Sequence, residues 1–259
     1  MINSTSNQRV KQIVAWNQKG KLRNEQKVFL VEGIKMFLEA PVEQIMEVYV
    51  SENLHLDNLL MKKLKMCNWE TVSGQVFSKI SDTKTPQGIL CVLRQFKYDV
   101  GDITHKKNPL IMLLEDIQDP GNLGTILRTA EGAGVDGVIM SMETVDIYNP
   151  KTIRATMGSI YRMPFVYTED LVDTMDTLKE NGIRIYAAHL KGTVLYDEAS
   201  YIEGTGFLIG NEGNGLKDKT ANKADVYIKI PMDGKVESLN AAIASTVLMY
   251  EANRQKRHN

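Results

Sequence analysis

Short apolar runs alternate with amphipathic stretches over the first ninety positions of the chain. Residues 28–31, 48–50 and 89–93 have the length and composition of buried strands. Helically spaced apolar residues lie between these runs, and residues 8–19 are predicted to form a polar helix that stops at Gly20. Alternating strands and helices predict a small α/β unit over residues 1–94.

A second series of apolar runs follows residues 95–108, whose weak periodicity and mixed charge are typical of a linker. Helical stretches separate its predicted strands, which are mainly apolar. These strands are residues 110–114, 138–140, 183–187, 206–209 and 226–230. Such strands favour a mostly parallel sheet covered on both faces. We therefore expect a second α/β domain over residues 109–259.

The last predicted helix, residues 239–250, has apolar side chains on every face. A helix of this kind is buried on all sides. Because this helix lies near the end of the chain, a partner subunit could cover it together with its own domain.

Charge is unevenly distributed along the 259 residues, of which 43% are hydrophobic. Residues 1–27 hold six cations and one acid, a balance of +5, whereas the whole chain has a net charge of −1. A basic module on a mildly acidic body is typical of a polyanion binder with a separate catalytic part. A solvated first helix would give the same pattern.

The composition argues against several classes of protein. Cys67 and Cys91 are too few for a disulfide framework and lack metal-ligand spacing, so we expect reduced core cysteines and no metal. Residues 1–20 contain no apolar signal segment, and no window is apolar enough to span a membrane. We expect a cytoplasmic protein.

Three loops follow predicted strands at their carboxyl ends, where parallel α/β sheets bind ligands. The first contains Asp119-Pro-Gly-Asn122 and leads into a helix predicted to start near Asn122, which places Arg128 within the first two turns. A cation there opposes the helix dipole. Arg128 is therefore a candidate phosphate ligand, although an ordinary surface arginine would also fit.

The second loop, Gly210-Asn-Glu-Gly-Asn-Gly215, supplies positive φ angles and close backbone approach. Its glycine spacing matches neither the dinucleotide fingerprint nor the Walker loop. Glu212 could accept hydrogen bonds from a ribose or pair with Arg128, and a plain strand-to-helix turn would have the same composition.

The third loop runs from Ile230-Pro-Met232 to Ser238-Leu-Asn240 at the start of the last helix. A hydroxyl, an amide and free backbone N–H groups at a helix start suit a polar small molecule.

Taken together, the loops resemble the motifs of the SpoU/TrmH family of RNA ribose 2′-O-methyltransferases. The family motifs are Asn-x-Gly-x-x-x-Arg, Gly-x-Glu-Gly-x-Gly, and Ile-Pro-Met followed by Ser-Leu-Asn, and this chain has all three in order and spacing. Residues 149–159 also look like a family segment. Residues 27–33 resemble the RNA-binding substrate domain of members that act on ribosomal RNA.

The resemblance implies a SPOUT-like fold with a deep trefoil knot, and a homodimer with its active site at the subunit interface. It also implies that the knot loops bind S-adenosylmethionine through Gly210, Ile230, Met232 and Leu239, with Leu190 near the adenine. The residues implied for the RNA site are Arg128 and Asn122, which would hold phosphate and ribose, and Glu212, Ser238 and Asn240, which would support them.

The expected function is therefore methylation of a ribose 2′-hydroxyl in structured RNA, with ribosomal RNA favoured over transfer RNA. A catalytically inactive RNA-binding protein with this fold is the alternative, and the glycine spacing disfavours an NAD-type oxidoreductase. A guanidinium is normally unable to accept a proton, so we expect Arg128 to clamp phosphate and polarise the hydroxyl. Trp16, with Lys11 and Lys19, could contact RNA, but a tryptophan on the inner face of the first helix is the simpler interpretation.

Overall fold

The computed structural model describes residues 1–258, which divide into two compact units. The first unit contains Met1–Phe96 together with Asp146–Tyr161, and the second contains Lys97–Val145 and the chain from Arg162 onwards. The segment 146–161, which the sequence-based division places in the second domain, therefore packs with the first unit. Its helix α8 (Pro150–Thr156) contacts strand β1 (Val28–Glu32).

A four-stranded sheet forms the centre of the first unit, in the order β1-β4-β2-β3. Strand β4 pairs antiparallel with β1 and β2, and β2 pairs parallel with β3. The other three strands are β2 (Ile45–Ser51), β3 (Trp69–Val72) and β4 (Ile89–Arg94). The helices are α1 (Gln8–Gln18), α2 (Gly20–Gln26), α3 (Ile34–Glu39), α4 (Asn58–Leu64) and α5 (Gly74–Ile80), with a 3-10 turn at Val42–Gln44.

The first helix differs from its prediction at its end. Gly20 begins α2 rather than ending α1, because the extended Lys19 (φ −120°, ψ 99°) separates the two helices. Trp16 is buried, and its Nε1 donates to Gln26 Oε1 at 2.9 Å. The inner-face interpretation of Trp16 is therefore confirmed, and this ring is not available to stack on RNA.

Three of the six basic residues near the N-terminus, Arg9, Lys21 and Arg23, have ion-pair partners inside the unit. Arg23 is only 3% exposed and lies 2.6 Å from Asp146, while Arg9 pairs with Glu70 at 3.1 Å. Lys11 and Lys19 are exposed. A buried arginine needs a nearby acid to offset its charge, so Arg23 adds no positive charge to the surface. The basic surface is therefore smaller than the sequence indicates.

The second unit is built on a seven-stranded sheet in which every strand pair is parallel. The mostly parallel sheet predicted from the apolar runs is confirmed. In spatial order the strands are β7 (Phe165–Thr168), β6 (Gly137–Ser141), β5 (Leu110–Leu114), β10 (Thr205–Ile209), β8 (Arg184–Ala188), β11 (Val226–Lys229) and β9 (Val194–Leu195). Strands β7 and β9 were not predicted.

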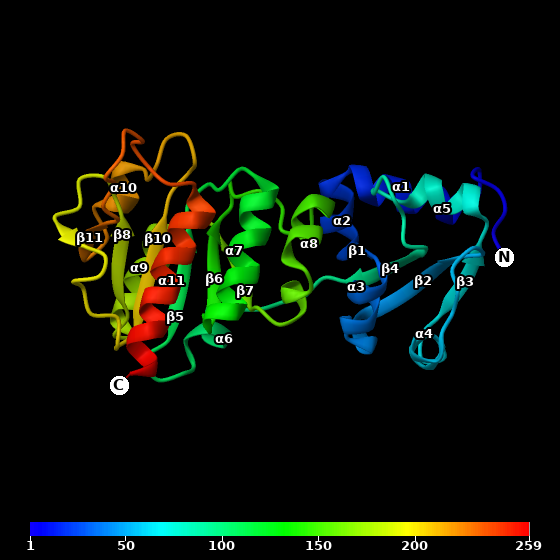
Figure 1. The fold of residues 1–259 in the computed structure, drawn as a ribbon, viewed down its shortest axis with the longest axis horizontal. Coiled ribbons are helices and arrows are strands. Elements are labelled where there is room, and N and C mark those ends of the chain that lie inside the picture. The colour runs from blue at the N-terminus through cyan, green and yellow to red at the C-terminus, as the bar shows by residue number, and fades with distance from the viewer. Residues whose placement is uncertain (259) are drawn as a thin grey trace. The chain divides into compact units, whose positions relative to one another are not determined.

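Helices cover both faces of this sheet. On one face α7 (Pro120–Ala133) and α11 (Ala241–Arg257) lie side by side (Figure 1). On the other, α9 (Leu171–Glu180) and α6 (Val100–Thr104) complete a buried cluster with the strands. Helix α6 lies within the predicted linker, where a capping box between Asp99 and Asp102 starts it. A short helix α10 (Asp218–Ala221) follows β10.

Helices α7 and α11 run in the same direction, so their N-termini meet at one end. Asn240 donates to Asn122 at 3.0 Å there, and Asn253 donates to Ala133 O at 2.9 Å at the opposite end. Within this chain α11 is not covered on all sides, because Ile243 and Tyr250 are 51% and 48% exposed.

Within residues 1–258, no helix is both long and apolar enough to cross a membrane. The same residues contain no group of three or more His, Cys, Asp or Glu side chains placed to hold a metal ion. Cys67 is half-buried and Cys91 buried, and both are free. Burial raises the pKa of both thiols.

Candidate active site

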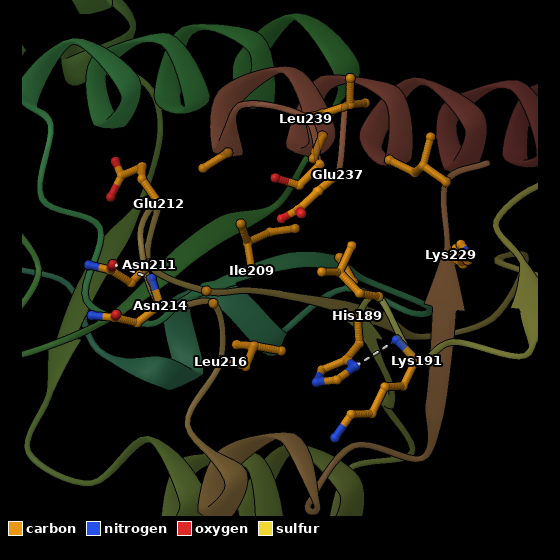
Figure 2. Close-up of a pocket in the computed structure, with 18 of the residues that line it drawn as sticks. His189, Lys191, Ile209, Asn211, Glu212, Asn214, Leu216, Lys229, Glu237 and Leu239 are labelled. Atoms are coloured by element: carbon orange, nitrogen blue, oxygen red, sulfur yellow. Dashed lines mark hydrogen bonds between the residues drawn. The ribbon is translucent and has the colours of Figure 1, made fainter. Parts of the chain in front are cut away.

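The loops after β8, β10 and β11 meet around one cavity of about 410 Å³ at the carboxyl ends of the strands. Figure 2 shows Ile209 and Leu216 in its centre, with Asn211 and Asn214 on one side and Lys191 on the other. All five residues expected to bind the cofactor line this cavity: Leu190, Gly210, Ile230, Met232 and Leu239.

The loop after β10 closes on itself through its own backbone. The N–H groups of Asn211 and Gly215 each donate to the other residue's carbonyl at 3.0 Å. A Cβ on Gly210 would lie 2.4 Å from the carbonyl carbon of Gly215, and Gly215 itself has φ +69°. Only glycine fits position 210, and position 215 also favours it.

Glu212, at the tip of this loop, connects it to the loop after β5. Its carboxylate accepts from Asn122 Nδ2 at 2.9 Å and from the backbone N–H groups of Gln118 and Asp119 at 3.1 and 3.2 Å. Partial burial raises the pKa of Glu212, but these hydrogen bonds together outweigh it, so the net pKa lies below its usual value. The carboxylate is therefore ionised at neutral pH and fixes the Asn122 amide.

Helix α7 begins two residues earlier than predicted. Asp119 is its N-cap and accepts from Asn122 N at 2.8 Å, and Pro120 occupies the first helical position, which suits proline. Arg128 is consequently the ninth residue of the helix and lies beyond its first two turns. The prediction that Arg128 opposes the dipole at the helix start was wrong, because the effect of the dipole falls off within the first turn.

The residues expected at the RNA site are only partly brought together. Asn122, Glu212 and Asn240 form a continuous hydrogen-bonded chain, and Glu212 and Ser238 line the cavity. Arg128 is exposed, does not line the cavity, and has no hydrogen-bond or ion-pair partner within residues 1–258. The suggested pairing of Glu212 with Arg128 is not made in this structure.

The sequence reasoning missed several polar residues of the cavity wall. His189, Lys191, Lys229 and Glu237 all line it. The His189 ring stacks on Tyr227 with centroids 4.8 Å apart, and its Nδ1 accepts from Lys191 N at 3.1 Å. Their position directly after predicted strands was the signal that could have found His189 and Lys191.

Two acidic residues after β5 also escaped the sequence reasoning. Glu115 is only 3% exposed and accepts from Lys217 N at 2.8 Å and from the Thr220 hydroxyl. Asp116 adopts φ +54°, pairs with Lys217 at 2.5 Å, and its carbonyl accepts from Asn211 Nδ2 at 2.8 Å. A left-handed non-glycine residue is strained, and such strain clusters at functional sites. Both residues fix the loop after β10.

Comparison with known proteins assigns the chain to a family. Residues 109–250 match the SpoU rRNA Methylase family, and residues 7–91 match the MRM3-like substrate binding domain. The chain belongs to the SpoU rRNA Methylase family.

The relatives include one that is similar along nearly the whole chain. The chain is 33% identical over 251 residues, 96% of its length and 97% of the relative's, to the 23S rRNA (guanosine(2553)-2′-O)-methyltransferase RlmP of Bacillus subtilis (strain 168). A solved structure of an AdoMet-bound rRNA methyltransferase from Sinorhizobium meliloti has a TM-score of 0.88 and 31% identity, covering 98% of this chain and 97% of its own.

A further structure aligns with only part of the chain. A protein solved to explain 2-OH methylation of C/U34 on tRNA is 29% identical with a TM-score of 0.54, and covers 59% of this chain but 99% of its own. That relative has the length of one part of the present chain alone.

Proposed function

We propose that this protein transfers the methyl group of S-adenosylmethionine to a ribose 2′-hydroxyl of ribosomal RNA. As a SpoU family member, the chain is an RNA 2′-O-methyltransferase that uses S-adenosylmethionine. The observation that carries the proposal is that the second and third motif loops line one cavity, while Asn122 of the first motif loop is hydrogen-bonded to Glu212 and Asn240 of the other two.

The cavity fits the cofactor in size and chemistry. Its volume of about 410 Å³ falls within the roughly 300–1,000 Å³ of small-molecule sites. The bare backbone at Gly210 allows close approach, because a side chain there would strike the loop itself. Gly210, Ile230, Met232, Leu239 and Leu190 would hold the adenosyl part. S-adenosylmethionine supplies a methyl group that its sulfonium already activates, so alignment of the acceptor is the protein's main task.

The chain Glu212–Asn122–Asn240 gives the acceptor side its fixed geometry. The ionised Glu212 accepts a hydrogen bond from the Asn122 side-chain N–H, and the Asn122 side-chain oxygen accepts one from the Asn240 side-chain N–H. Both amides therefore have defined orientations. We infer that Asn122 and Asn240 position the ribose, that Ser238 supports it, and that Arg128 clamps a phosphate. The hydroxyl proton leaves late, to solvent, because the guanidinium normally cannot accept it.

Two features support a homodimer formed through the second unit. The α11 residues Ile243 and Tyr250 leave an apolar stripe uncovered, and a partner copy would bury it. Arg128 lies outside the cavity of its own chain, so we propose that it serves the cavity of the partner. We also propose that the C-terminal part of the sheet forms a deep trefoil knot and that the protein acts in the cytoplasm.

The first unit favours ribosomal RNA over transfer RNA. The aligned protein studied for tRNA methylation covers only 59% of this chain, whereas RlmP, named for 23S rRNA, matches 96% of it. An additional substrate-binding unit would suit a larger RNA.

The proposal is tested by methyl transfer in solution. Purified protein and labelled S-adenosylmethionine are incubated with ribosomal RNA, with ribosomal particles from a strain lacking the gene, and with transfer RNA. We expect one ribose methylation in ribosomal RNA that is absent from that strain. Methylation of transfer RNA alone would overturn the choice of substrate, and cofactor binding without any transfer would favour the inactive RNA-binding alternative.

A further inference from the structure

The first unit carries an exposed polar edge that the methyl-transfer site does not use. The edge is formed by loop 81–87 and by helix α8, and we call it the loop–helix edge. Arg154 Nη1 lies 2.5 Å from Asp82 Oδ2 and joins the two parts. The exposed side chains of the edge are Asp82, Lys84, Thr85, Pro86, Gln87, Lys151 and Arg154.

Loop 81–87 is held in place by a single carboxylate beneath it. Glu32 accepts from Ser81 Oγ at 2.8 and 2.9 Å, from Thr83 Oγ1 at 2.8 Å and from Asp82 N at 3.2 Å. These bonds fix the start of the loop while its tip remains exposed. A preorganised exposed loop binds a partner with little further loss of conformational entropy.

Gln87 presents an oriented donor on the same edge. Its Oε1 accepts from Ile34 N at 2.9 Å, which identifies that atom as the amide oxygen. The Nε2 group has no hydrogen-bond partner within residues 1–258, so its N–H groups are available at the surface. With Lys84 and Arg154, the edge offers N–H donors and positive charge beside the Asp82 carboxylate. An acceptor-rich anion such as a phosphodiester backbone complements it.

Helix α8 is firmly attached to this unit. The ion pair of Arg23 with Asp146 precedes α8, and Tyr161 OH donates to Met36 O at 2.9 Å after it. The Arg154–Asp82 pair, by contrast, is exposed, with 41% and 46% of the side chains accessible. Such a surface pair contributes little net stability, so Arg154 can exchange the carboxylate for a phosphate, which it can hold in a two-bond fork.

We propose that the loop–helix edge is the surface by which the first unit docks the phosphate backbone of ribosomal RNA, with Arg154 and Lys84 contacting phosphates and Gln87 donating a hydrogen bond. The inference rests on the proposed function and extends it. Helix α8 belongs to the part of the chain that matches the methylase family, yet it acts in RNA docking rather than in cofactor binding.

The first test measures binding of the full-length protein to deproteinised 23S ribosomal RNA at several salt concentrations. Arg154→Ala and Lys84→Ala should each weaken binding about 3- to 10-fold and lower the salt slope by about one. Lys65→Ala, which removes an exposed lysine at the end of α4, is the matched control and should bind as the wild type does. Wild-type affinity in Arg154→Ala would overturn the proposal.

Asp82→Ala separates RNA contact from a merely structural role of the ion pair. If Arg154 binds phosphate, removal of its competing carboxylate leaves RNA binding unchanged or tightens it. If the pair only clamps α8 to the loop, Asp82→Ala and Arg154→Ala weaken binding equally. Equal weakening would overturn the proposal.

Kinetics distinguish failure of this inference from failure of the proposed function. Arg154→Ala should raise KM for ribosomal RNA while its Kd for S-adenosylmethionine, measured by calorimetry, stays at the wild-type value. Wild-type protein that never methylates ribosomal RNA contradicts the proposed function. Wild-type methylation with an unchanged KM in Arg154→Ala contradicts the docking surface alone.

Discussion

The loops after β10 and after β11 line the same cavity but are built in opposite ways. Residues 210–217 are tied by backbone bonds within the loop and by Glu115, Asp116 and Gln118 from the loop after β5. Residues 231–239 make no hydrogen bond or ion pair within the described part of the chain, and Val236 is 62% exposed. One wall of the cavity is therefore preformed, and the other is held only at its ends.

This difference indicates how the site would bind its cofactor. A wall with many bonds retains its shape without ligand, whereas a segment with few contacts lies at the low-stability end of the molecule. We expect the loop after β10 to select the cofactor by shape and the loop after β11 to close on it. The cost of ordering residues 231–239 would then reduce the observed affinity.

Replacing one glycine in each loop by alanine should show the difference between the two walls most strongly. In Gly210→Ala the new Cβ meets the backbone of Gly215 at 2.4 Å, so the preformed loop must shift at a cost of about 1–3 kcal/mol. We expect cofactor affinity, measured by calorimetry, to fall about 10- to 100-fold.

Gly234→Ala is the matched control in the other wall, because a Cβ there meets nothing within 4 Å. Its cofactor affinity should lie within about twofold of the wild type, since surface substitutions usually change free energies by less than about 0.5 kcal/mol. Equal effects of the two substitutions would remove the distinction between the walls.

Arg128→Lys tests a residue that belongs to neither wall. Lysine keeps the charge but loses the planar fork, so we expect single-turnover methylation to slow by about tenfold while cofactor affinity is unchanged. Near-full methylation by the variant would refute the bidentate phosphate clamp. A loss of cofactor affinity would instead indicate that Arg128 contacts the cofactor rather than a phosphate of the RNA.

The smallest expected effect concerns the anchoring of the preformed wall by Glu212. Its folded pKa lies below its ordinary value, so its stabilising contribution is present above the unfolded pKa of about 4.3 and is lost as pH falls through the folded pKa. The free energies of unfolding of wild type and Glu212→Gln, measured with urea, should therefore differ at pH 7 and converge as the pH falls through the folded pKa of Glu212. A difference in unfolding free energy that does not change with pH would contradict the lowered pKa of Glu212 in the folded protein.

The sequence was sufficient to predict local patterns and motif positions. The apolar run at 110–114 coincides with β5, and the five expected cofactor residues all line one cavity, because the carboxyl ends of parallel strands meet at one edge. The roles of those residues remain predictions.

Features that depend on distant partners could not be predicted. Burial of Arg23 requires Asp146, which lies 123 positions away, and the same contact attaches segment 146–161 to the first unit. The left-handed Asp116 is held by Ser141 at the end of β6 and by Lys217 and Asn211 after β10. The start of α7, in contrast, could have been predicted from neighbouring residues alone. Asp119 as N-cap followed by Pro120 at the first helical position is a common way for a helix to begin.

Hydrogen exchange with and without S-adenosylmethionine tests the central claim most directly. We predict that residues 231–239 exchange quickly in the free protein and become protected by the cofactor, whereas residues 210–216 are already protected and change little. Protection that appears outside both loops, or in neither, would contradict the assignment of this cavity to the methyl donor.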